Sequence, residues 1–234
     1  KNSFLVALHG STDASIGHGY KIVIMRKGQK LQTFMDGFLV GKNIDYIYSQ
    51  EDRFLFVRNN EVIEMIKEIN PDEIVLATGV VPVIPNIVGI FKNHVVLAHD
   101  VLSGEASTGS KVAIIGGGLV GLEVAELLTE QHKEVTVIEM ADDIVKDMGF
   151  LRKAFTLEYV RKEGIQIIKD AKCTEIKDLS IRIEKEGKQM ELVEINSVVI
   201  AAGAMPNNEI EESLKGMHIP YHVIGDALKP RKAL

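Results

Sequence analysis

The sequence predicts an α/β fold in which parallel strands alternate with covering helices. Three observations support this prediction. Residues 111–140 show the pattern of a strand, a glycine-rich turn, a helix and a second strand. Residues 73–82 and 197–206 each form an apolar strand followed by a small residue, a glycine and a proline. The chain has 234 residues, of which 46% are hydrophobic, so it is long and apolar enough for one large or two modest cores.

The first half of the segment 111–140 has the features of a phosphate-binding turn. The strand 111–115 is apolar after its lysine, as expected of a parallel strand covered on both faces. Gly116, Gly118 and Gly121 follow at the spacing G-x-G-x-x-G. The first glycine permits the tight turn, the second lets backbone amides approach a pyrophosphate, and the third lets the helix pack against the strand. We therefore expect an anion at the N-terminus of the helix.

The second half of the segment returns to a strand that ends in an acid. Apolar residues recur at helical spacing after the turn, which predicts a helix with one face on the sheet: Val120, Val124, Leu127 and Leu128. The strand 134–138 ends at Glu139, about twenty residues beyond the turn, where a carboxylate binds the ribose hydroxyls of a dinucleotide. That carboxylate would repel the extra phosphate of NADP, so the pattern favours NAD(H).

The predicted NAD(H) contacts come from this unit and from the end of the strand 197–201. They are Gly116, Gly118, Leu119, Val120, Gly121, Glu139, Met140, Ala202 and Gly203. The alternative is a βαβ unit that packs without binding a ligand.

Composition excludes several other classes of function. A formal charge of −6 and a pI near 5.7 argue against nucleic acid as the main partner. The chain has no apolar run of about 20 residues, so we expect no membrane association and a cytoplasmic location. The single cysteine, Cys173, rules out a redox pair within the chain and is interpreted as a core thiol.

Polar residues outside the glycine-rich turn predict no further chemistry. The seven histidines show no metal-ligand spacing, so no metal is expected, and no catalytic residue is assigned. Asp142, Asp143 and Asp147 are interpreted as solvated loop acids. Both ends of the sequence look cut, so we expect a piece of a larger protein.

Other elements follow from periodicity and from proline and glycine. Strands are expected at residues 3–8, 21–25, around Phe54 and Phe56, and at 73–77, with a helix at 61–69 ended by Pro71. Residues 80–85 are expected to be an extended crossover, and 103–110 a linker, which places a domain boundary near residue 104. A helix near Leu151, a strand at 165–168 and a hairpin at 181–193 complete the set.

Several segments carry a resemblance to a known family. They are ATG at 77–79, IGGGLVGLEVAE at 115–126, VIEM at 137–140, AAGAMPNN at 201–208 and IGDALKPRKAL at 224–234. From about residue 61 to the end the chain resembles the two-dinucleotide-binding flavoproteins. Within these it is most similar to the C-terminal module of the NADH:flavin oxidoreductases, which include 2,4-dienoyl-CoA reductase, 2-enoate reductase and trimethylamine dehydrogenase.

The resemblance implies two Rossmann-like, three-layer domains, with the NAD domain inserted into an FAD-type domain. Residues 105–203 would form the NAD(H) domain, and residues 1–104 with 204–234 the FAD-type domain. FAD contacts would come from Gly10, Thr78, Gly79, Gly225 and Asp226, with Asp226 accepting a ribityl hydroxyl. NADH would reduce FAD, and electrons would pass to an N-terminal TIM barrel that carries FMN and an iron–sulfur cluster. The resemblance also pairs Glu123 with a lysine near the flavin; a surface or capping role is the alternative.

The first motif departs from that family. Residues 9–20 read HGSTDASIGHGY, in which only Gly10 lies near the turn. Aligning the next strand with the family puts Arg26 where an acid should hold the ribose of FAD. Residues 9–20 number 12, against 19 for residues 116–134, and the difference of 7 is about two helical turns. Three explanations stay open: a degenerate FAD site, a different ligand, or residues of a longer chain that this sequence omits. A non-catalytic NAD(H)-binding or docking domain is the alternative function.

Overall fold

The computed structural model describes residues 3–8, 21–26, 32–35, 63–64, 66–67, 70–146 and 148–230. Contacts divide the chain into two compact units. Unit 1 comprises Lys1–Val81 with Ala204–Leu234, and unit 2 comprises Pro82–Gly203. The first division precedes β6 (Val95–Leu97) and α2 (Ala98–Leu102), which both pack into the cores of unit 2. The domain boundaries expected near residues 104 and 203 stay predictions.

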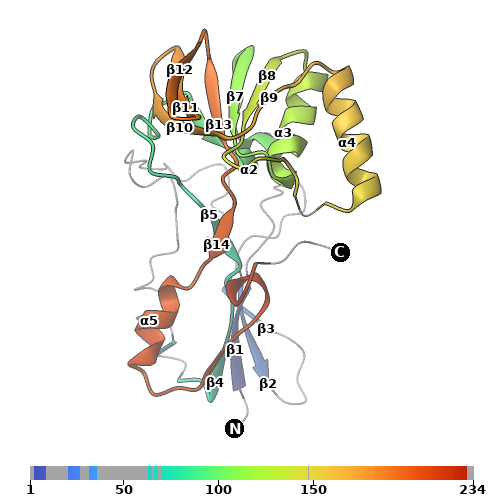
Figure 1. The fold of residues 1–234 in the computed structure, drawn as a ribbon. Helices are drawn as coiled ribbons and strands as arrows, with labels where there is room; N and C mark the ends of the chain where they lie inside the picture. The colour runs from blue at the N-terminus through green and yellow to red at the C-terminus, as the bar shows by residue number, and fades with distance from the viewer. Residues whose placement is uncertain are drawn as a thin grey trace. The chain divides into compact units, whose positions relative to one another are not determined.

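Unit 2 is built on a fully parallel five-stranded sheet (Figure 1). Its strand order is β6 (Val95–Leu97), β13 (Ser197–Ile200), β7 (Lys111–Ile115), β8 (Glu134–Ile138) and β9 (Gln166–Ile168). Every residue of β13 is buried, and so are the last four of β7 and of β8. This is the burial expected of strands covered on both faces, and it accounts for their continuous apolar sequences.

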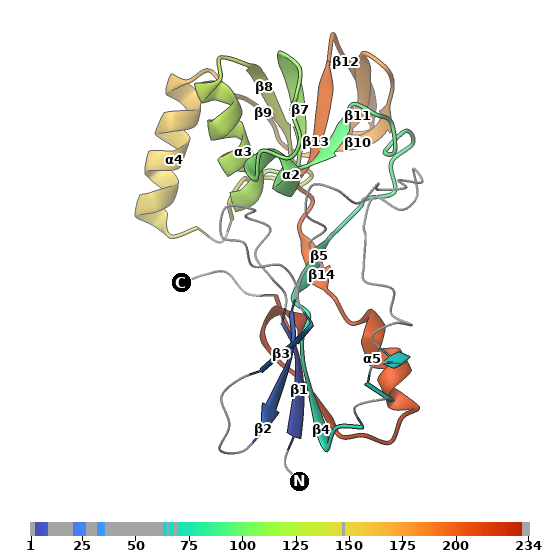
Figure 2. The same cartoon turned by 180° about the vertical axis from the view of Figure 1, so that it is seen from behind.

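Different elements cover the two faces of this sheet (Figure 2). Helices α2 (Ala98–Leu102), α3 (Leu119–Glu130) and α4 (Phe150–Lys162) lie on one face. An antiparallel sheet of β10 (Ala171–Ile176), β11 (Ser180–Lys185) and β12 (Lys188–Val193) lies on the other.

Alternate residues of β7 divide between these two layers. Val112 and Ile114 pack into the cluster that contains Leu128 of α3, whereas Ala113 packs with Ile181 of β11. Side chains of a strand alternate between the two faces of its sheet, so one short apolar strand contributes to both cores. Unit 2 is therefore a three-layer α/β structure, as expected.

Unit 1 contains a mixed five-stranded sheet. Strands β15 (Tyr221–Val223), β4 (Glu73–Ala77) and β1 (Ser3–Leu8) are parallel neighbours. Strands β2 (Lys21–Arg26) and β3 (Gln32–Met35) continue the sheet antiparallel. Helix α5 (Glu209–Lys215) packs Ile210 and Leu214 against Ile74 and Leu76 of β4. A mixed α/β fold with parallel strands and covering helices is thus confirmed.

The direction of β2 corrects one sequence expectation. Aligning β2 with the second strand of a βαβ unit requires it to run parallel to β1, but the two are antiparallel and pair Ser3 with Arg26. Arg26 therefore lies at the amino end of β1, away from the edge where a nucleotide would bind. The connection of 12 residues is at the lower limit for a parallel crossover, which takes a dozen or more residues and usually a helix.

The two repeated sequence segments occupy corresponding places in the two units. Strand β4 is followed by Gly79 and the short strand β5 (Val80–Pro82), and β13 is followed by Gly203 and β14 (Ala204–Pro206). Both glycines have positive φ, 69° and 97°, which favours glycine at these turns. Strands β5 and β14 pair as a two-stranded sheet, so the segment expected to be merely extended contains a short paired strand.

Most of the remaining sequence predictions are confirmed in the described residues. Strands β1, β2, β4, β9 and β13, helix α4 and the hairpin of β11 and β12 lie where they were expected. The described part of residues 61–69 is helical and buries Ile66. Phe54 and Phe56 lie outside the described residues.

Two leucines on neighbouring helices test the assignment of the core. Leu128 in α3 is 1% exposed and packs into the main cluster, whereas Leu151 in α4 is 68% exposed. We expect Leu128→Ala to lower the free energy of unfolding by about 2–5 kcal/mol, because it leaves a cavity. Leu151→Ala, the matched control, should change it by less than about 0.5 kcal/mol. Chemical denaturation measures both, and equal losses would contradict the assignment.

Candidate dinucleotide-binding site

The candidate site lies at the carboxyl ends of β7, β8 and β13 in unit 2. From β7 the chain continues to β8 and β9 on one side, whereas β13 and β6 lie on the other side. The strand order therefore reverses between β7 and β13. In open α/β sheets the crevice at such a reversal is where ligands bind. The loop 116–118 and residues Ala202 and Gly203 follow the two strands that flank it.

Gly116 and Gly121 are required by packing within the chain itself. Gly116 has φ of 116°, and a Cβ there would lie 2.3 Å from the carbonyl oxygen of Ala201. A Cβ on Gly121 would lie 2.0 Å from the carbonyl oxygen of Gly116. Both distances are far below van der Waals contact with backbone. These two glycines thus allow β7, β13 and the first turn of α3 to approach closely.

Gly118 is a different case, although it belongs to the same motif. It precedes α3 as the N-cap, with φ of −75°, a conformation that any residue adopts. A Cβ at this position would meet no atom within 4 Å. Neither backbone strain nor packing in the described residues therefore demands glycine here. A ligand that approaches the N-terminus of α3 would need this unoccupied space beside Gly118.

The N-terminus of α3 presents backbone donors without side-chain partners. The N-cap residue Gly118 offers no side-chain hydrogen bond, and the first turn contains no acidic residue. The first N–H groups of a helix have no intrahelical acceptor, and the helix dipole favours an anion beside them. Leu119 and Val120 form this turn, and Val120 is 46% exposed. This end of the helix therefore suits a pyrophosphate.

Glu139 is held against the glycine-rich loop by both of its carboxylate oxygens. Oε2 accepts a hydrogen bond from the Gly117 N–H at 2.6 Å, and Oε1 accepts one from the Ala141 N–H at 2.7 Å. The carbonyl oxygen of Gly117 accepts a third bond from the Val145 N–H at 2.9 Å. These bonds fix the position of the carboxylate, and Met140, 68% exposed, lies next to it in the chain.

Gly117 is a site residue that the spacing of the motif did not reveal. It stands at a variable position of G-x-G-x-x-G, yet a Cβ there would lie 2.7 Å from Ile144 and 3.1 Å from the Cβ of Glu139. Residues 144–145 thus pack directly on the glycine-rich loop. The run of three glycines was the only sequence signal for this contact.

In unit 1 the predicted FAD residues lie at one edge of the sheet. Thr78 and Gly79 follow β4, and Gly225 and Asp226 follow the parallel neighbour β15 in the 3-10 turn Gly225–Ala227. The Ile224 N–H donates to the carbonyl oxygen of Leu76 at 2.9 Å, which holds the start of the second loop against β4. The Thr78 hydroxyl donates to the carbonyl oxygen of Asn207 at 2.5 Å. Gly10 lies outside the described residues.

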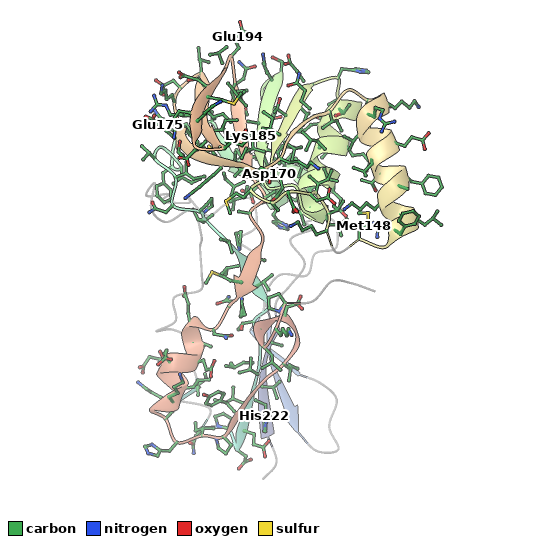
Figure 3. The ribbon with its side chains drawn as sticks, in the orientation of Figure 1. Met148, Asp170, Glu175, Lys185, Glu194 and His222 are labelled. Atoms are coloured by element: carbon green, nitrogen blue, oxygen red, sulfur yellow. The ribbon has the colours of Figure 1, made fainter. Side chains whose placement is uncertain are left out.

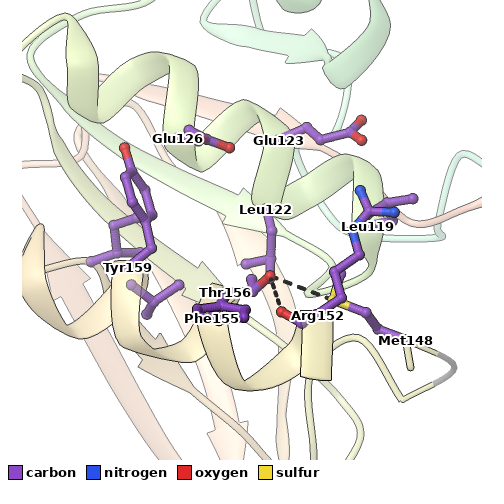
Figure 4. Close-up of a pocket in the computed structure, with 11 residues that line it drawn as sticks. Leu119, Leu122, Glu123, Glu126, Met148, Arg152, Phe155, Thr156 and Tyr159 are labelled. Carbon is purple, nitrogen blue, oxygen red and sulfur yellow. Dashed lines mark hydrogen bonds between the residues drawn. The ribbon is translucent and has the colours of Figure 1, made fainter. Parts of the chain in front are cut away.

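A groove of about 350 Å³ lies between α3 and α4 on the outer side of unit 2 (Figure 4). Leu122, Phe155 and Val160 are among its apolar lining residues. Glu123 and Arg152 line it and are exposed. The Thr156 hydroxyl bonds within α4, to the carbonyl oxygen of Arg152 at 3.0 Å. Glu123 therefore lies on a helix surface, which agrees with the alternative expected for it.

Three further observations concern the cysteine, metal binding and membrane spanning in the described residues. Cys173 lies in β10, and burial raises the pKa of its thiol to about 11, so it is a core thiol. The described residues contain no cluster of histidine, cysteine and acidic side chains suited to a metal ion. No described helix is long and apolar enough to cross a bilayer.

The fold and the site define a class of protein, an α/β dinucleotide-binding protein with a Rossmann-like unit. A family model for the pyridine nucleotide-disulphide oxidoreductases matches residues 10–222. The chain therefore belongs to the pyridine nucleotide-disulphide oxidoreductase family. Members of this family bind FAD and NAD(H), in agreement with the cofactors expected from the sequence.

Similar proteins in this family are oxidoreductases. The chain is 38% identical to an NADH oxidase of Thermoanaerobacter brockii, over 73% of this chain and 27% of that protein. It is 35% identical to a cinnamate reductase of Clostridium sporogenes, over 71% of this chain and 25% of that protein. The solved structure of a 2-naphthoyl-CoA reductase complex matches with a TM-score of 0.65 and 30% identity, over 73% and 26% of the two chains. The chain thus spans about a quarter of the length of each.

The different roles of the glycines can be tested by stability alone. We expect Gly121→Ala to lower the free energy of unfolding by about 1–3 kcal/mol, because its Cβ overlaps backbone that cannot yield cheaply. Gly118→Ala should cost less than about 1 kcal/mol, since its Cβ meets open space. Denaturant titration of both variants without cofactor provides the measurement. A large loss in Gly118→Ala would show that packing, and not a ligand, explains that glycine.

Proposed function

We propose that the chain is the FAD- and NAD(H)-binding module of an NADH-dependent flavin oxidoreductase. The observation that carries the proposal is the contrast between Gly118 and its two neighbours in the motif. Packing accounts for Gly116 and Gly121, but Gly118 stands beside free helix N–H groups with no atom near its Cβ position. A pyrophosphate would account for this glycine, because only glycine leaves room for it to reach those donors.

The other residues proposed to contact NAD(H) lie at the same edge of the sheet. Glu139 would accept hydrogen bonds from the hydroxyls of the adenosine ribose. Its hydrogen bonds from the Gly117 and Ala141 N–H groups fix the carboxylate in position. Leu119, Val120, Gly121 and Met140 would border the cofactor on this side. Ala202 and Gly203, after the neighbouring strand β13, would border it on the other side, and Gly203 leaves open space at its Cβ position.

The FAD side of the proposal rests on the carboxyl ends of β4 and β15. FAD would be held there by Thr78, Gly79, Gly225 and Asp226. Asp226 would accept a hydrogen bond from a ribityl hydroxyl. Gly225 has φ of 63° and open space at its Cβ position, which fits the close approach of a cofactor. When both cofactors are bound, the nicotinamide supplies a hydride and the flavin accepts it, while the protein orients and shields them.

The relatives suggest the setting of this module. Their lengths leave room for the N-terminal barrel with FMN and an iron–sulfur cluster that the resemblance implies. The names cinnamate reductase and 2-naphthoyl-CoA reductase favour reduction of a conjugated carboxylate or CoA ester by the whole protein. We assign that step to the barrel and the supply of electrons to this chain. The single buried cysteine gives this chain no part in disulfide chemistry.

One observation favours a second function, a non-catalytic NAD(H)-binding or docking domain that has lost FAD. The antiparallel pairing of β1 and β2 does not form the βαβ unit that would bind the FAD pyrophosphate. The NAD(H) site of unit 2 does not depend on that unit, so it would persist under this alternative.

NADH titration of Gly118→Ala tests the NAD(H) site. We expect the Kd for NADH to rise at least about tenfold, which is 1.4 kcal/mol, because the new methyl group occupies the place of the pyrophosphate. Quenching of the nicotinamide fluorescence is the measurement, and the stability of the variant serves as the folding control. Unchanged affinity in a folded variant would contradict the site.

Flavin reduction distinguishes the two functions. The 234-residue chain is incubated with excess FAD, desalted, and its visible spectrum is recorded before and after NADH is added without oxygen. The leading proposal expects a retained flavin spectrum that bleaches with NADH. A colourless protein that still binds NADH would establish the second function instead, and a retained flavin that NADH does not bleach would contradict hydride transfer.

A further inference from the structure

Helix α4 turns its apolar side chains away from the core of unit 2. Phe150, Leu151 and Phe155 are 88%, 68% and 61% exposed, whereas Val160 is the one buried residue of this helix. Ala154 is exposed beside them, and the four exposed residues share one face, because helix positions three and four apart are neighbours. A surface helix normally buries its apolar stripe and exposes its polar side, so α4 shows the reverse pattern.

The charged residues of α4 include one that faces the loop before the helix. Lys153 is only 20% exposed, and its Nζ lies 2.5 Å from Asp143 Oδ2. Figure 3 labels Met148 in that loop, just before the helix begins. This ion pair ties the first turn of α4 to unit 2 through a polar side chain and leaves the apolar face directed outward.

The same loop corrects one interpretation of the sequence. Asp142 and Asp143, expected to be solvated loop acids, both form ion pairs. Asp142 Oδ1 lies 2.5 Å from Lys146 Nζ, and Asp143 Oδ1 lies 3.8 Å from Lys169 Nζ. The third acid of this group, Asp147, lies outside the described residues.

The groove between α3 and α4 continues the apolar face (Figure 4). Leu119, Leu122 and Phe155 are among the residues that line it. Helices α3 and α4 follow the parallel strands β7 and β8, so both begin at the same edge of the sheet and run in the same direction. Apolar side chains therefore lie along the first half of both helices.

The second halves of the two helices carry opposite charges. In α3, Glu126 and Glu130 are exposed and have no basic partner among the described residues. Burial is the chief cause of the raised pKa of Tyr159 in α4, and the charges of Glu126 and Glu130 add to it. In the last turn of α4, Arg161 and Lys162 are exposed. One helix thus ends in acidic side chains and the other in basic ones.

We propose that the outer face of α3 and α4 is a docking surface for a second copy of this chain. With a two-fold axis along the helices, α4 of each copy lies over α3 of the other. The apolar face of α4 then meets the partner's groove, while Arg161 and Lys162 meet the acidic end of the partner's α3. A two-fold interface uses the same patch on both copies, so the patch must complement itself. An apolar half, an acidic end and a basic end at matching levels meet that requirement.

The exposed apolar area is of the size that such an interface uses. With about 200 Å² for a fully exposed aromatic side chain, Phe150, Leu151 and Phe155 together expose about 400 Å². Apolar patches of about 300–600 Å² on a monomer are often functional. A specific dimer buries about 800 Å² on each copy. These three side chains would supply about half of that area, and the groove and the charged residues around it would supply the rest.

Sedimentation velocity of the 234-residue chain without cofactor tests the surface. At about 1 to 100 μM we expect a concentration-dependent species of twice 25.8 kDa. Leu151→Glu should raise the Kd of the dimer at least about 30-fold, because it places a charge in the centre of the apolar contact. The matched control is Leu179→Glu, in the turn between β10 and β11, where the leucine is 64% exposed and the Kd should not change.

A charge exchange tests the arrangement of the two copies. Arg161→Glu/Lys162→Glu and Glu126→Lys/Glu130→Lys should each raise the Kd at least about tenfold, because like charges then meet across the interface. An equimolar mixture of the two variants should form a heterodimer with a Kd within about threefold of the wild-type value. In that mixture each reversed helix meets the oppositely reversed helix of the other variant.

The outcomes decide the inference without reference to the cofactors, on which it does not rest. A wild-type chain that stays monomeric over this range would overturn it, and so would an equal loss of association in Leu179→Glu. Charge variants that fail to associate when mixed would overturn the two-fold arrangement. All the changed side chains are exposed, and circular dichroism checks that each variant folds. If Leu151→Glu does not fold, the charge exchange alone decides.

Discussion

The close approach of three backbone segments at the end of β7 is the constraint on which the rest of unit 2 depends. Gly116 meets the carbonyl oxygen of Ala201, and Gly121 meets that of Gly116, at distances that leave no room for a Cβ. These contacts set β13 beside β7 and press the first turn of α3 onto the strand. The position of the helix N-terminus, and with it the candidate pyrophosphate site, follows from this packing.

Hydrogen bonds of Gly117 extend this arrangement to the acid Glu139. Gly117 donates to Glu139 and accepts from Val145, so this one residue links the loop after β7 to the residue after β8 and to Val145. The lysine and aspartate pairs lie on the same loop and on its neighbours. The candidate ribose acid and these ion pairs are therefore parts of one connected structure.

The two units share one way of building a binding edge and differ in how completely they carry it out. In each, an apolar strand is followed by a glycine with positive φ and then by a short paired strand. Unit 2 adds an intact βαβ turn to this edge, whereas the first two strands of unit 1 pair antiparallel. The candidate NAD(H) site consequently rests on a complete motif, and the proposed FAD site rests on the ends of β4 and β15.

The sequence by itself determined the βαβ unit and the residues of the candidate NAD(H) site, because glycine spacing and apolar periodicity are local signals; the three-layer architecture was implied by the family resemblance. It located β7, α3, β8 and Glu139, whose positions depend on neighbours within thirty residues. Only the tertiary structure decided the direction of β2, the division at residue 82, and the partners of Asp142 and Asp143. Strand direction and domain division depend on long-range packing, and Lys169 meets Asp143 only because β9 lies beside β8, a contact that no local pattern records.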